Sequence, residues 1–88
     1  MVDTLTQGNT LVIRPGEAEK SIRETFAKVY EALQDKGYDP VNQIVGYLMS
    51  GDPTYITSHR EARGLIATLQ RDDIVEFLVR KYLSAENM

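Results

Sequence analysis

The sequence predicts an all-α fold, a compact bundle of about four helices, on three observations. Apolar residues recur at spacings of three and four along most of the chain, which is the period of an amphipathic helix. Residues that typically begin or end helices stand at the borders of these stretches. The chain has 88 residues, which is enough for one domain with a thin core. Domains this small are often reinforced by association, so a homodimer is expected.

The first helix is expected over about residues 17–36. Its apolar residues lie on one face: Ile22, Phe26, Val29, Tyr30 and Leu33. Glu17 and Glu19 stand in the first turn, where the helix dipole favours carboxylates. Gly37 then supplies the left-handed residue that commonly ends a helix.

The second helix is expected to begin at Asp39-Pro40 and to end near Gly51. Aspartate is a favoured N-cap, and proline fits the first helical position because its missing N–H is not needed there. Gly46 lies inside this helix and Gly64 inside the next, each at a cost of about 1 kcal/mol relative to alanine. Such a cost suggests a close approach by another backbone, within the fold or across a dimer interface.

The third and fourth helices are expected to share one start signal, a capping box. In the third helix Ser58 is the cap and Glu61 completes the box; in the fourth, Asp73 and Glu76 take these roles. The apolar residues expected to face inward are Ala62, Leu65, Ile66 and Leu69, then Ile74, Phe77, Leu78 and Tyr82. Residues 85–88 are expected to fray.

The N-terminal region differs in composition from the rest of the chain. Residues 1–9 are mostly polar, so they are expected to form a flexible arm. Residues 10–14, TLVIR, are rich in β-branched residues and end at Pro15-Gly16, which allows one short N-terminal strand. The single helical domain is therefore expected over residues 10–84.

The composition argues against several classes of function. The chain has no cysteine, a net charge of −3 and a pI near 5.0, which fits a reducing compartment and disfavours nucleic acid as a partner. It contains no apolar run of the length that spans a bilayer and no signal-peptide pattern. We therefore expect a cytoplasmic protein that does not insert into membranes.

Catalytic and metal-binding patterns are weak. His59 is the single histidine, and no nucleophile with a base and an orienting group can be assembled around it. It is interpreted as a surface residue in the first turn of the third helix. The acidic residues Asp72, Asp73 and Glu76 resemble a helix start more than a metal site. The sequence therefore predicts no enzyme activity, no metal site and no cofactor.

Gly-Tyr, Asp-Pro and Asn-Gln pairs gather between positions 37 and 63, where an ordinary helical domain needs no such residues. They include candidates for a partner or dimer surface: Asn42, Gln43, Gly46, Tyr47, Asp52 and Tyr55. A purely structural role for each of them stays open, because loops and helix ends also use such residues.

A helix-turn-helix-like, nucleic-acid-binding module is the alternative of a different class. His59, Arg60 and Arg63 open the second of two neighbouring helices, as in a recognition helix. The connection before them is longer than the usual three or four residues, and the chain is acidic.

The same region resembles the IreB family of small bacterial regulatory phosphoproteins. The resemblance covers about residues 10–83 and is densest in four stretches: Gly37-Tyr38-Asp39-Pro40, Asn42-Gln43-Ile44-Val45-Gly46-Tyr47, Ser50-Gly51-Asp52-Pro53 and Tyr55-Ile56. It implies a cytoplasmic, helical, dimeric protein without enzymatic activity. It also implies phosphorylation by a membrane-anchored serine/threonine kinase with PASTA modules, in signalling from the cell envelope to a downstream protein that the sequence does not name.

The family's acceptor threonines lie three residues apart before a short hydrophobic segment. Thr10, followed by Leu-Val-Ile, matches the second of them, whereas Gln7 stands where the first would be. The resemblance thus implies Thr10 as the phosphorylation site, with Thr6 and Thr4 nearby. The basic residues Arg14, Lys20 and Arg23 are candidates to receive the phosphate or simply a solvated face. A structural dimer adaptor whose arm is never modified remains the second alternative.

Overall fold

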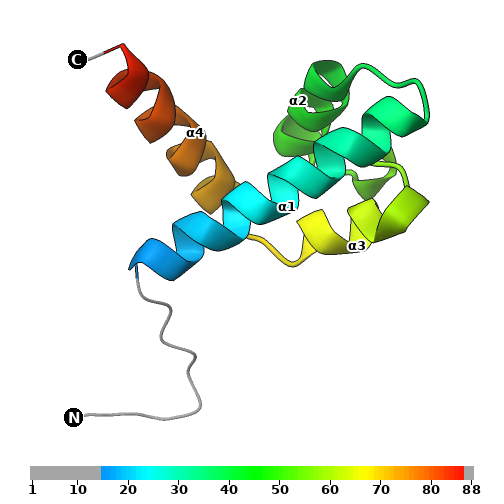
Figure 1. The fold of residues 1–88 in the computed structure, drawn as a ribbon. Helices are drawn as coiled ribbons and strands as arrows, with labels where there is room; N and C mark the ends of the chain where they lie inside the picture. The colour runs from blue at the N-terminus through cyan, green and yellow to red at the C-terminus, as the bar shows by residue number, and fades with distance from the viewer. Residues whose placement is uncertain (1–14, 87–88) are drawn as a thin grey trace, which may run out of the picture.

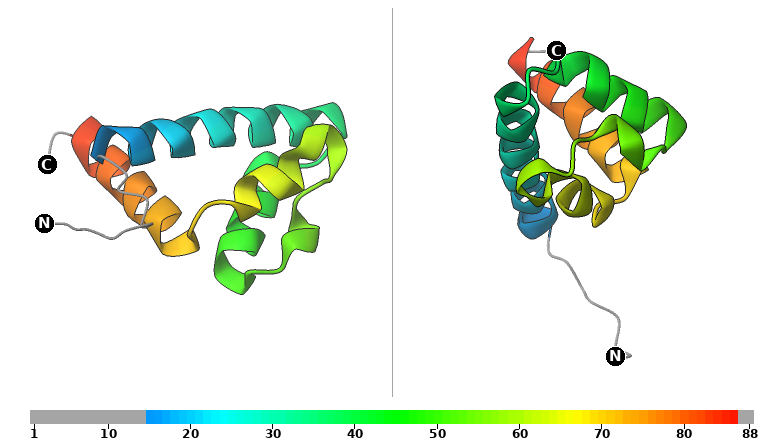
Figure 2. Two further views of the ribbon diagram at one scale, coloured as in Figure 1. Left: turned by 90° about the horizontal axis from the view of Figure 1, so that it is seen from below. Right: turned by 90° about the vertical axis from the view of Figure 1, so that its right-hand side faces the viewer.

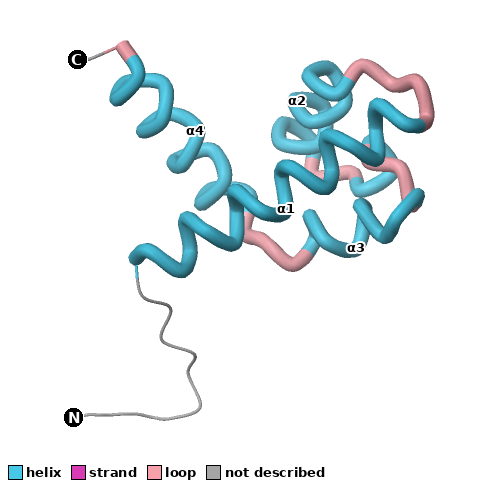
Figure 3. Tube along the Cα trace, viewed as in Figure 1, coloured by secondary structure: helices cyan, strands magenta, loops and turns pink. Residues whose placement is uncertain are grey.

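The protein is described by a computed structural model, which describes residues 15–86. Over that range the chain is helical and contains no strand, so the predicted all-α class is confirmed. The expected arm at residues 1–9 and the expected strand at residues 10–14 lie outside the described residues. The four α-helices are connected by loops and two short 3₁₀ turns (Figures 1 and 3).

Helix α1 (Pro15–Asp35) runs the length of the molecule, and the other helices pack along one side of it (Figure 2). Ile22, Val29 and Leu33 are buried as predicted, and Phe26 packs against the core. Tyr30 is instead 48% exposed, so its predicted inward position is wrong. Successive residues of an α-helix are turned by about 100°, so Tyr30 lies at the edge of the face that Val29 and Leu33 define and stays half exposed.

Helix α2 (Pro40–Ser50) begins and ends as the sequence predicts. The carboxylate of Asp39 accepts hydrogen bonds from the backbone N–H groups of Val41, at 3.0 Å, and Asn42, at 3.3 Å. At the other end Gly51 has φ of 75°, and its N–H donates to the carbonyl of Tyr47 at 2.7 Å.

The segment after α2 departs from the prediction. It forms two 3₁₀ turns, η1 (Pro53–Tyr55) and η2 (His59–Glu61), before helix α3 (Ala62–Ala67) begins. Arg60 and Glu61 have left-handed φ values of 56° and 64°, so the capping box expected at this start is wrong. The side chain of Ser58 caps nothing, and the hydroxyl of Thr57 instead accepts a bond from the N–H of His59 at 3.1 Å.

Helix α4 (Arg71–Ala85) starts two residues before the predicted cap, Asp73, and its N-cap residue, Gln70, makes no side-chain capping bond. Glu76 pairs with Arg80 one turn later, at 2.8 Å, instead of completing a capping box. Ile74 is buried as predicted, but Tyr82 is 59% exposed, which corrects its inward assignment. Helix α4 contacts α1 as far as Lys81, which pairs with Glu19 at 2.9 Å, and its C-terminal end points away from the body (Figure 1).

The core lies over the C-terminal half of α1, where α2, the connecting loop and α3 meet it. Its buried members are Val29, Ala32, Leu33, Tyr47, Ile56, Ala62, Ile66 and Ile74. Leu69, expected on the stripe of the third helix, packs against this core from a position beyond the end of α3. With extents of 49 × 34 × 21 Å, the molecule is elongated, and α4 contributes little to its core.

Candidate functional site around helix α2

The loop between α2 and α3 is held against the body by side-chain bonds to two consecutive carbonyls. Gln43 of α2 donates from Nε2 to the carbonyl of Tyr55 at 2.8 Å. Arg63 of α3 donates from Nε to the carbonyl of Ile56, also at 2.8 Å. Ile56 is fully buried, so these bonds fix the backbone where the loop enters the core. The loop is consequently an ordered feature of the surface.

Gly46 is where this loop meets helix α2. A Cβ atom at position 46 would overlap the aromatic ring of Tyr55. The close approach predicted for Gly46 is therefore present, although a ring makes it and not a backbone. Gly64 differs, since a Cβ there would meet nothing within 4 Å in the single chain.

Asp52 organises the start of the loop. Its carboxylate accepts from the Thr54 hydroxyl at 2.7 Å and from the Thr54 N–H at 2.9 Å. These two bonds, the hydroxyl bond first, hold the pKa of Asp52 below its ordinary value. They are the local bonds that aspartate makes in turns. Asp52 nevertheless remains exposed at the surface.

The six candidate residues separate into three groups. The structure brings together Gln43, Gly46 and Tyr55, which join α2 to the loop. It places Tyr47 in the core, with 6% exposure, so Tyr47 packs the single chain and is not available at its surface. Asn42 and Asp52 are exposed. The candidate threonines Thr4, Thr6 and Thr10 lie outside the described residues.

Arg71 is a residue whose role the sequence did not reveal. Its guanidinium donates from Nη1 to the carbonyl of Leu48 at 3.0 Å, which is one of the carbonyls that a helix end leaves without a partner. It also lies so close to Gly51 that a Cβ there would fall 2.8 Å from Cζ of Arg71. Arginine at the start of one helix gives no local signal that it caps another, because the two are 23 positions apart.

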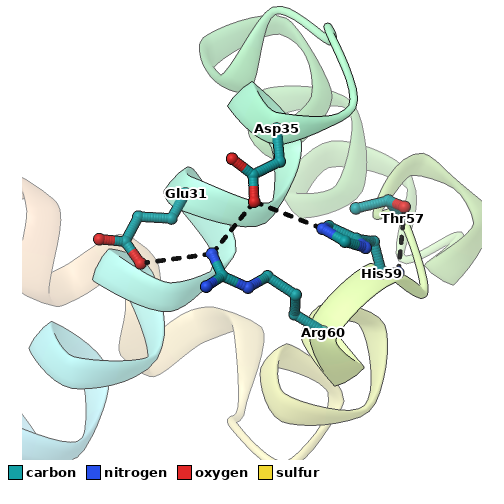
Figure 4. Close-up of polar contacts among 5 residues, drawn as sticks. All are labelled: Glu31, Asp35, Thr57, His59 and Arg60. Atoms are coloured by element: carbon teal, nitrogen blue, oxygen red, sulfur yellow. Dashed lines mark hydrogen bonds and ion pairs between the residues drawn. The ribbon is translucent and has the colours of Figure 1, made fainter.

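The η2 turn carries a cluster of charges (Figure 4). Arg60 reaches from this turn to Asp35 at 3.1 Å and to Glu31 at 3.7 Å, both on α1. The ring of His59 lies 3.4 Å from the same Asp35 carboxylate. His59 is thus partly exposed, as expected, but in a 3₁₀ turn and not in an α-helix. The cluster ties the left-handed turn to α1.

No grouping of three or more potential metal ligands occurs within residues 15–86. Among the described helices, none has the length and apolar character that crossing a bilayer takes.

The chain matches the family described as IreB regulatory phosphoprotein over residues 9–84. This match spans most of the 88 residues, so the chain belongs to the IreB family, and the resemblance found in the sequence is confirmed. The family is one of regulatory phosphoproteins, which agrees with a regulatory, non-enzymatic role.

Proposed function

We propose that this protein is a cytoplasmic substrate of a membrane serine/threonine kinase and relays cell-envelope stress signals through contacts with other proteins. The observation that carries the proposal is the family match over residues 9–84. That range includes Thr10, whereas Thr4 and Thr6 precede it. Thr10 is therefore the acceptor that we propose first.

Phosphorylation would act through charge. A phosphate on Thr10 adds about −1.5 to −2 charges at pH 7, only five positions before α1 begins at Pro15. Of the basic residues considered as receivers, Arg23 already pairs with Glu19 at 2.8 Å. A phosphate docking there would have to compete with that pair, although exposed pairs of this kind are weak.

The downstream partner would contact the α2–α3 loop. Asn42, Asp52 and Tyr55 are exposed around it, and Tyr55 shows 40% of its surface. Because Gln43 and Arg63 hold the loop backbone, this surface is presented with little loss of conformational entropy on binding. An ordered surface loop is a common place for recognition.

Nucleic acid is a poorer partner for the same structure. Of the cations that would open a recognition helix, Arg60 pairs with Glu31 and Asp35, and Arg63 bonds to the carbonyl of Ile56. Phosphate contacts need cations that are free to replace counterions. Helix α3 is also only six residues long.

The proposal is tested by phosphosite mapping. The full chain is incubated with the kinase domain of a PASTA-type kinase, and modified positions are located by mass spectrometry. We expect one phosphate at Thr10, absent from Thr10→Ala and retained in Thr4→Ala and Thr6→Ala. A chain that stays unmodified would favour the structural adaptor, and a phosphate that persists in Thr10→Ala would move the acceptor elsewhere.

A further inference from the structure

Helices α1 and α4 border a groove near the N-terminal end of α1. The two helices diverge from the core toward the left of Figure 1, and the groove, with a volume of about 440 Å³, lies between their facing sides. Its apolar lining comes from Ala18 and Ile22 of α1 and from Phe77 of α4. Ala18 and Phe77 are only partly covered in the described chain. The groove is therefore an apolar surface with room for a few side chains.

An apolar tripeptide, Leu-Val-Ile, ends two positions before α1. In an extended segment alternate side chains point to the same side. Leu11 and Ile13 would then form one side, whereas Thr10, Val12 and Arg14 would form the other. The first of these sides is wholly apolar, and it is the side that matches the lining of the groove.

The length of this segment also suits the groove. Residues 10–14 span about 16 Å in extended form, whereas the stretch of α1 from its start at Pro15 to Ile22 is about 10 Å long. The chain that precedes Pro15 can consequently fold back along the groove as far as Ile22. A segment tethered this close has a high effective concentration at the groove, so it needs weaker contacts than a separate peptide would.

We propose that residues 10–14 dock in this groove of the same chain. Leu11 and Ile13 then pack on its apolar lining. The gain from burying two apolar side chains is opposed by the entropy of ordering five residues. The docked and undocked forms therefore differ little in free energy, and a single added charge is enough to shift the balance between them.

Thr10 would lie at the inner end of the groove, where Asp73 forms part of the rim. Asp73 is next to Ile74, which is buried in the core. The carboxylate of Asp73 makes no ion pair among residues 15–86, and Arg80, the cation of the same rim, is already paired with Glu76 at 2.8 Å. A phosphate on Thr10 would thus be repelled by Asp73 and release the segment. This release rests on the proposed function, whereas the docking itself does not.

Nuclear magnetic resonance tests the docking in the full chain. We expect nuclear Overhauser contacts from the methyl groups of Leu11 and Ile13 to the ring of Phe77, and none from those of Val12. Isotope-labelled and unlabelled chains are mixed, so that contacts within one chain are separated from contacts between copies. Contacts that are absent, that come from Val12 instead or that arise only between copies would overturn the proposal.

The effect of charge is tested with two variants of equal size at position 10. Thr10→Glu should weaken the contacts of Leu11 and Ile13 about two- to fivefold, the effect of one exposed like-charge pair, and Thr10→Gln should leave them unchanged. Adding Asp73→Asn to Thr10→Glu should restore them. Equal contacts in Thr10→Glu and Thr10→Gln would contradict the release. These variants need no kinase, so a chain that is not phosphorylated at Thr10 would contradict the proposed function and leave the docking result as measured.

Discussion

At the scale of single residues, Gly46 and Gly64 show how position decides the value of a glycine. Both lie in helices, where alanine is favoured by about 1 kcal/mol. Gly46 lies under the ring of Tyr55, whereas nothing lies within 4 Å of the Cβ position of Gly64. One glycine is therefore required by packing, and within the single chain the other is not.

We expect Gly46→Ala to lower the free energy of unfolding by up to about 2 kcal/mol, because an overpacking cost of about 1–3 kcal/mol is offset by only about 1 kcal/mol of helix propensity. Urea unfolding followed by circular dichroism measures it. Gly64→Ala is the matched control and should raise stability by about 0.5–1 kcal/mol. If the two substitutions have the same effect, the Tyr55 ring does not constrain position 46. Adding Tyr55→Ala should remove the cost of Gly46→Ala.

At the scale of helices, the end of α2 depends on a distant residue. Gly51 provides the left-handed turn, but the carbonyl of Leu48 is satisfied by Arg71 from the start of α4. The ion pair between Lys81 and Glu19, at 2.9 Å, adds a polar link between α4 and α1. Helix α4 is thus attached to the body through the polar contacts of Arg71 and Lys81. It buries few apolar groups.

We expect Arg71→Met to lower stability by about 1 kcal/mol, because it removes a charged hydrogen bond to a helix end while keeping an unbranched apolar stem. Arg80→Met is the control, since the exposed pair of Arg80 with Glu76 lies within α4 and such pairs contribute less than about 0.5 kcal/mol. Both are measured by urea unfolding. Equal losses for the two variants would contradict a capping role for Arg71.

At the scale of the whole molecule, two carboxylates link stability to pH. The pKa of Asp52 is lowered by its bonds from Thr54, the hydroxyl first. The pKa of Glu19 is lowered by the hydrogen bond from Lys81 first and then by the charge of Lys81. Their ordinary values are 3.8 and 4.5. A lowered pKa in the folded state means stability that is present above these values and lost as the pH falls through the lowered ones.

We therefore expect Asp52→Asn and Glu19→Gln to lower the thermal midpoint at about pH 6 and to match the wild type at about pH 2. Thermal unfolding across that range measures the difference. Glu24→Gln serves as the control, because Glu24 is an exposed carboxylate of α1 with no ion pair among the described residues. A midpoint difference that persists unchanged at the low pH would show that these substitutions act through something other than the charge.

The helical class, the end of α1 near Gly37, the limits of α2 and the family could all be predicted from the sequence, whereas α1 begins at Pro15, before the expected residue 17. Those features depend on apolar period and on helix ends such as Asp39 and Gly51, which are local and are written in neighbouring residues. The resemblance pointed to Thr10 as the acceptor, which stays a prediction. It also marked the α2 region as unusual, although residues of that kind suit both loops and interfaces.

How those residues are used depends on contacts between distant parts of the chain. Ser58 and Glu61 have the spacing of a capping box, yet α3 begins only at Ala62. The residues before it form a left-handed turn, which Arg60 ties to Asp35. Tyr82 repeats with the inner face of α4, yet it is 59% exposed, because the C-terminal end of α4 points away from the body. Contacts between distant positions, such as that of Gly46 with the Tyr55 ring, arise from packing in three dimensions, and no local pattern encodes them.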